Sequence, residues 1–105
     1  MFGFYGRILT IDLSRNESRV ESLPDEFLAG CLGGKGLATR LLLEKNPVGV
    51  DPLAPENHLI INTGPFCQSR LWGGSRYGVY TKSPLTGFYS ESYSGGKVPE
   101  AIDSS

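Results

Sequence analysis

The stretch LIINTGPFCQSRLWGGSRYGVYTKSPLTGFYSESYSGG, residues 59–96, decides the fold because short strand-like runs alternate in it with glycine-rich turns. Leu59–Ile61 is a short apolar run that predicts a central strand, buried on both faces. Tyr77–Thr81 and Phe88–Ser92 predict two further strands. Lys82–Gly87 contains a proline and a glycine and predicts the hairpin loop between them.

Upstream of this stretch, the chain predicts a second hairpin. Arg7–Leu13 alternates apolar and polar residues, which is the period of a half-buried strand. Its apolar face carries Leu9, Ile11 and Leu13. Ser18–Ser22 predicts a weaker partner strand after a polar turn.

Two helices are expected between the hairpins. A short one is predicted to begin at Pro24-Asp25-Glu26, since proline and acidic residues favour a first helical turn. A longer one is predicted over Leu37–Lys45, and Asn46-Pro47 ends it. One face of this helix carries Leu37, Ala38, Leu41 and Leu42. Residues 1–105 therefore predict a single α+β domain, a β-rich sheet with one or two short helices.

Charge and hydropathy exclude two classes of partner. Ten basic and eleven acidic residues give a net charge of −1, so the chain lacks the broad positive field that attracts nucleic acid. The longest uninterrupted apolar stretch is Leu41–Leu43, far short of the roughly 20 residues of a membrane helix. We expect a cytoplasmic protein with no membrane partner.

Catalytic and metal-binding patterns are scarce. Cys31 and Cys67 lack the spacing of metal ligands, and we expect two reduced thiols. His58, the single histidine, is interpreted as a structural or surface residue. The sequence therefore predicts neither a catalytic residue nor a metal ligand.

Three glycine-rich segments are candidate binding sites. Gly33–Gly36 precedes a helix and favours either a phosphate loop or a plain tight turn. Arg76 follows Gly73-Gly74, where its planar guanidinium suits phosphate, carboxylate or pterin-type acceptors, although a surface arginine beside a bulge is the alternative. Ser92–Gly96 predicts either a nest of N–H groups for an anion or only a turn.

Taken in order, the motifs resemble those of the aldehyde:ferredoxin oxidoreductase family. They cover residues 1 to about 98 and occur in the family's order. They are Gly3 with Gly6-Arg7, Leu32–Leu37, Val50–Asn57, Thr63–Pro65, Gly74–Tyr77, Thr81–Gly87 and Ser94–Gly96.

The resemblance implies the first domain of an enzyme that oxidises aldehydes to carboxylic acids and passes electrons to ferredoxin. Its cofactors are a tungsten bis-molybdopterin with magnesium and a [4Fe-4S] cluster, in whose chemistry the protein supplies orientation and electrostatics. By this resemblance the arginine at position 76 lies between pterin and cluster. The segment containing Tyr93, Ser94, Gly95 and Gly96 contacts the pterin and its phosphates, largely through backbone.

Two departures from the family pattern affect the expectation. Tyr93 stands where many members have asparagine, and the loop Phe66–Trp72 is bulkier than the family's. The family's cluster cysteines and most of its substrate cavity lie in later domains, so we expect the chain alone to be inactive and to bind no cofactor stably. Its partners would be those domains or a split subunit, with an apolar or glycine-rich surface that meets them and invites homo-oligomers. A stand-alone module that binds a pterin, a nucleotide or a protein is the alternative.

We further expect Arg76 and the Ser-Gly-Gly bend near residue 95 to converge on one shallow cavity, although they are far apart in the sequence.

Overall fold

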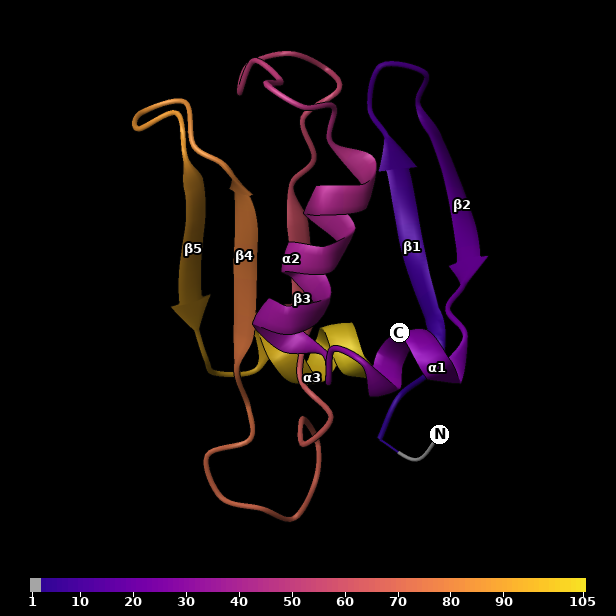
Figure 1. The fold of residues 1–105 in the computed structure, drawn as a ribbon. Helices are drawn as coiled ribbons and strands as arrows, with labels where there is room; N and C mark the ends of the chain where they lie inside the picture. Colours follow the sequence, from indigo (N-terminus) through magenta and orange to yellow (C-terminus); the bar gives the residue numbers. More distant parts are fainter. Residues whose placement is uncertain (1–2) are drawn as a thin grey trace.

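The computed structural model describes residues 3–105, which form two antiparallel sheets and three helices (Figure 1). The first sheet is a two-stranded hairpin, and the second has the strand order β3-β4-β5. In chain order the elements are β1 (Arg7–Asp12), β2 (Glu17–Ser22), α1 (Asp25–Ala29), α2 (Gly34–Lys45), β3 (Ile60–Thr63), β4 (Tyr77–Lys82), β5 (Tyr89–Ser94) and α3 (Val98–Ser104). The predicted α+β class is confirmed.

The β1–β2 hairpin forms where it was predicted, but its exposed and buried faces are reversed. The Asp12 carboxylate accepts hydrogen bonds from the backbone N–H groups of Ser14 and Arg15, which stabilises the turn. Ile8 packs toward the helices, whereas Leu9 and Ile11 are exposed. The prediction that the more apolar row faces the core was therefore wrong, because Ile8 and the threonine at position 10 occupy the side nearer α2.

In the second sheet, β4 is central and β3 is an edge strand. Ile60 pairs with Tyr80, and Tyr80 pairs in turn with Glu91 of β5. The prediction of a central strand buried on both faces at Leu59–Ile61 was wrong: Ile60 is half-buried, and Leu59 and Ile61 are exposed. Helix α2 covers only one face of the strand.

Helix α2 holds the two sheets together. Its four predicted core residues are all buried, which confirms that helical face. Leu37 and Leu41 join Leu28 of α1 in one cluster, to which Ile8 and Ile60 add. Ala38 and Leu42, on the neighbouring flank of the helix, join Tyr80 of β4 in a second cluster. Figure 1 shows α2 in front of β3 with the hairpin beside it.

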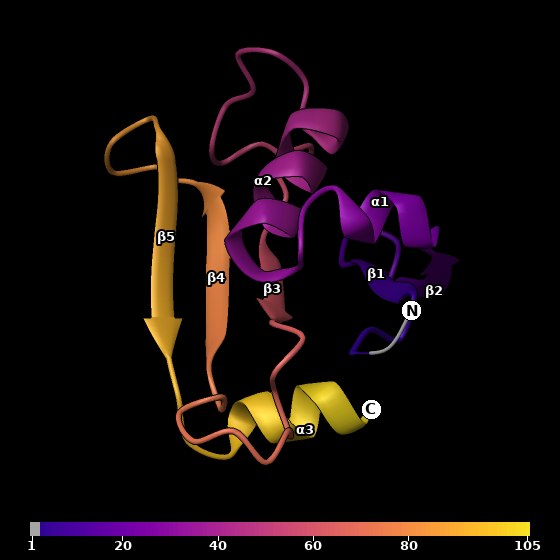
Figure 2. The same ribbon diagram turned by 60° about the horizontal axis from the view of Figure 1, so that its bottom comes forward.

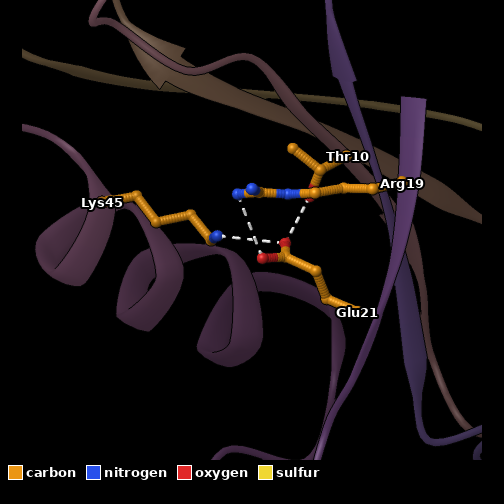
Figure 3. A network of polar contacts seen from close by, with 4 residues as sticks. All are labelled: Thr10, Arg19, Glu21 and Lys45. Carbon is orange, nitrogen blue, oxygen red and sulfur yellow. Dashed lines mark hydrogen bonds and ion pairs between the residues drawn. The ribbon is translucent and has the colours of Figure 1, made fainter. Parts of the chain in front are cut away.

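A polar network connects the β1–β2 hairpin to the end of α2 (Figure 3). The Glu21 carboxylate accepts a hydrogen bond from the Thr10 hydroxyl and forms ion pairs with Arg19 at 3.2 Å and Lys45 at 3.3 Å. These partners, the threonine hydroxyl first, lower the pKa of Glu21. Because β1, β2 and α2 all contribute, the network fixes the hairpin relative to the helix.

The sequence did not predict helix α3, which crosses the lower end of the second sheet (Figure 2). Pro99, near its start, is almost completely buried, and the Thr63 hydroxyl donates a hydrogen bond of 3.3 Å to Asp103. It has only seven residues, about two helical turns, so hydrophobic periodicity gave little signal. Within residues 3–105, every helix is too short or too polar to cross a lipid bilayer.

Candidate functional site

The register of the β4–β5 hairpin brings two of the glycine-rich segments together. Tyr77 pairs with Ser94, so the residues just outside this pair, Arg76 and Gly95, meet at the end of the sheet. A Cβ on Gly95 would lie 3.6 Å from an Arg76 guanidinium nitrogen. The Ser75 hydroxyl donates a hydrogen bond to the Gly96 carbonyl and closes the bend. Segments almost 20 positions apart thus form one site because a hairpin joins them.

A cavity of about 380 Å³ opens at this point. Its wall comes from the loop before β4, the bend after β5 and the first turn of α3. The lining residues are Gln68, Ser69, Leu71, Gly73, Gly74, Ser75, Arg76, Gly95, Gly96 and Glu100. The expected convergence of Arg76 and the Ser-Gly-Gly bend on one cavity is present in the structure.

Glycine is required at two positions of the wall. A Cβ on Gly74 would lie 2.5 Å from the carbonyl oxygen of Phe66, closer than real contacts allow. Gly96 has φ of +82°, a backbone conformation that disfavours other residues. These glycines leave backbone rather than side chains at the cavity surface, so a flat ligand can approach the main chain closely.

Tyr93 and Ser94, also predicted as binding residues, are not among the lining residues. The Tyr93 side chain lies on the α2 side of the sheet, where its hydroxyl donates a 3.0 Å hydrogen bond to Glu91. Its ring meets the ring of Tyr80 edge-on at 5.9 Å. Burial, the largest cause, raises the pKa of Tyr93. Tyr93 therefore supports β5 beneath the bend rather than facing the cavity.

Sequence reasoning missed the part of the cavity contributed by Gln68 and Glu100. Gln68 has φ of +58° and donates a side-chain hydrogen bond to the backbone carbonyl of Glu100, which joins the loop to α3. The Pro99-Glu100 pair was an available signal, since proline and an acidic residue favour a first helical turn.

The remaining candidates have structural roles. Gly33 and Gly34 both have positive φ, and Lys35 forms an ion pair of 2.9 Å with Glu91, which favours the tight-turn interpretation of the Gly33–Gly36 loop. The Nδ1 atom of His58 forms a hydrogen bond of 2.7 Å with the Oδ1 atom of Asn46. Among residues 3–105, His, Cys, Asp and Glu side chains form no group of three that could bind a metal ion.

A comparison with known families identifies the family of this chain. A family model described as the aldehyde ferredoxin oxidoreductase N-terminal domain matches residues 8–105. The chain therefore belongs to the aldehyde ferredoxin oxidoreductase family, and the sequence-based resemblance is confirmed.

Individual relatives show how much of such an enzyme the chain represents. The tungsten-containing aldehyde ferredoxin oxidoreductases of Pyrococcus furiosus and Thermococcus kodakarensis are each 46% identical to it over 96 residues. That alignment covers 91% of this chain and 16% of each relative. Among solved structures, a chain of the active-site complex BamBC of benzoyl-coenzyme A reductase with 1,5-dienoyl-CoA matches 96% of this chain. The TM-score is 0.87 at 29% identity, and the match covers 16% of that chain.

Proposed function

We propose that this chain forms one wall of the tungstopterin site of an oxidoreductase that converts aldehydes to carboxylic acids with ferredoxin as electron acceptor. The observation that carries the proposal is the cavity in which Arg76 faces the Gly95-Gly96 bend. Family membership supports it, since the tungsten-containing relatives match this segment at 46% identity. The two free thiols suit a reducing compartment, so the proposed location is the cytoplasm.

The residues present fit a phosphorylated pterin. The Arg76 guanidinium presents several donors in one plane, which suits phosphate oxygens and the polar edge of a pterin ring. Glycine at positions 74 and 95 keeps side chains off the backbone, because a Cβ would lie 2.5 Å from the Phe66 carbonyl oxygen at the first position and 3.1 Å from the Ser75 carbonyl oxygen at the second. A tungsten bis-molybdopterin with magnesium, when bound, would supply the oxidation chemistry.

This chain's own contribution would be to bind and orient. Arg76 would place a fixed positive charge beside the ligand, and the bend would offer backbone groups to its phosphates. The wall made by Leu71 and the α3 turn would exclude water from one side. Metal and cluster ligands would come from the later domains, because residues 3–105 contain no metal-binding group of His, Cys, Asp or Glu.

The substrate is proposed from the matched relatives. The name of the structural neighbour refers to benzoyl-coenzyme A, so the family fold serves more than one substrate. We assign aldehydes because the 46% identical relatives are aldehyde oxidoreductases. Trp72 is exposed in the bulky loop Phe66–Trp72 beside the cavity. We expect this loop to determine any difference in substrate preference from the relatives.

Titration of the purified chain with molybdopterin tests the binding role, with fluorescence of Trp72 as the signal. We expect weak binding, because an isolated wall excludes little water. Arg76→Ala should weaken it about tenfold or more, the effect of losing a hydrogen bond to a charged group. Arg15→Ala is the matched control, since Arg15 is highly exposed in the β1–β2 turn.

Equal binding by Arg76→Ala and the unchanged chain would overturn the proposal. A separate assay addresses activity: the pure chain should not reduce viologen in the presence of an aldehyde. Measurable aldehyde-dependent reduction would show that the remaining domains are unnecessary.

A further inference from the structure

One face of the two sheets carries a row of exposed aliphatic side chains. Leu9, Ile11, Val20 and Ile61 are 62%, 59%, 67% and 51% exposed. Leu9 and Val20 are direct cross-strand partners, so their side chains lie on the same face of the hairpin. We call these four residues the open face.

The open face is turned away from α2. Ile8 and Ile60 pack against the cluster that Leu37 of α2 helps to form. Because successive strand residues point to opposite faces, Leu9 and Ile61 point to the other side. The end of α3 contacts both uncovered faces, through Thr63 of β3 and Arg7 of β1, so the two faces lie on the same side of the molecule. Exposed apolar patches of this kind mark surfaces that other polypeptide covers.

The carboxyl end of the chain lies at this side. The Arg7 guanidinium donates a 3.1 Å hydrogen bond to the Ser105 carbonyl, and Arg7 occupies the same alternating positions of β1 as Leu9. Asp103 of α3 bonds to Thr63, which shares this side with Ile61. Helix α3 therefore already covers the lower end, and polypeptide following Ser105 would begin beside the open face.

The matched relatives continue well past this segment, which covers 16% of their length. In a solved chain of the family fold, the segment keeps its structure inside a much longer polypeptide, at a TM-score of 0.87. We propose that the open face is the docking surface for the polypeptide that follows this segment in the family's enzymes. The inference rests on the proposed function, since it names the partner that completes the same cofactor site.

The first experiment replaces the aligned 96 residues of the Pyrococcus furiosus relative with the matching part of this chain. Leu9→Lys and Ile61→Lys in this chimera should each reduce the yield of folded, protease-resistant protein several-fold, because a lysine would be trapped in the interface. Leu43→Lys is the matched control, since Leu43 is 79% exposed on α2 and lies outside the open face. Equal yields from all three variants would overturn the docking proposal.

Tungsten content, measured on the same proteins, separates the two proposals. Arg76→Ala should leave the chimera folded and lower its tungsten content. Loss of tungsten without any effect of the lysine substitutions would leave the cofactor role standing and reject the docking surface. The reverse pattern would reject the cofactor role alone.

The isolated chain provides a second test that does not depend on the chimera folding. Sedimentation should show a monomer or weak association, with binding of an apolar dye that Leu9→Lys and Ile61→Lys reduce and Leu43→Lys does not. A tight dimer dissolved by Leu9→Lys would show that a second copy covers the face, which would overturn the proposal. Dye binding unchanged by either open-face substitution would also count against it.

Discussion

Substituting Gly78 by alanine should destabilise the chain strongly. Gly78 and Tyr80 share one face of β4, and a Cβ at position 78 would overlap the Tyr80 hydroxyl and lie 2.6 Å from a ring carbon. Tyr80 is only 1% exposed and packs against Ala38 and Leu42, so its ring cannot swing away without leaving the core.

The expected loss in the free energy of unfolding lies between two limits. Shifting a packed ring to admit a methyl group costs about 1 to 3 kcal/mol. Expelling the ring altogether would cost about 3 to 5 kcal/mol, as truncation of a buried aromatic does. We expect about 3 kcal/mol for Gly78→Ala, a large part of the roughly 5 to 15 kcal/mol by which a native protein is stable.

Urea unfolding followed by circular dichroism measures this loss through the transition midpoint. Gly64→Ala is the control, because a Cβ there meets no atom within 4 Å and φ lies outside the strained positive range. It should change stability by less than about 1 kcal/mol. In a Tyr80→Leu background, Gly78→Ala should cost much less, because the overlapping ring is gone. A loss below about 1 kcal/mol for Gly78→Ala alone, or an equal loss in both backgrounds, would refute the reasoning.

Three further predictions concern charge, thiols and the cavity. The pKa of Glu21 is lowered in the folded state, so the ionised carboxylate stabilises the fold fully above its ordinary pKa. This stabilisation is lost as pH falls through the lowered pKa. Glu21→Gln should therefore flatten the acid side of a stability–pH curve measured by urea unfolding. Burial raises the pKa of Cys67, which is 7% exposed, so in a timed thiol-reagent assay it should react far more slowly than Cys31 until the chain is unfolded. Gly96→Ala should cost about 1 kcal/mol in urea unfolding, because its φ of +82° disfavours a side chain, and should also weaken molybdopterin binding.

The sequence predicted the locations of strands and helices better than their burial. The period of Arg7–Leu13 identified a strand correctly, but periodicity shows only that two faces differ. The more apolar row is exposed in this structure, while Ile8 on the other row packs under the helices. Under the docking proposal the open face accounts for this error, since a row that contacts further polypeptide would look like a core row in the sequence.

Helix α3 and its share of the cavity were missed for a different reason. Val98–Ser104 has only seven residues, too few to repeat a helical period clearly, and its position depends on long-range contacts such as Thr63 with Asp103. The convergence of Arg76 and Gly95 was foreseeable because a hairpin loop joined their strands. The sequence did not predict on which side of the sheet Tyr93 lies. That side depends on the strand register, which places Tyr93 opposite Gly78.

Helix α2 contributes to two core clusters, and this affects how the chain folds during synthesis. Both hairpins close over short loops and can form as soon as their own residues leave the ribosome. The helix, however, finds its second cluster only when Tyr80 has emerged, so until then Ala38 and Leu42 remain uncovered. A nascent chain arrested before β4 would therefore leave Ala38 and Leu42 of the otherwise buried helix face uncovered, and we expect chaperones to bind most strongly during this interval.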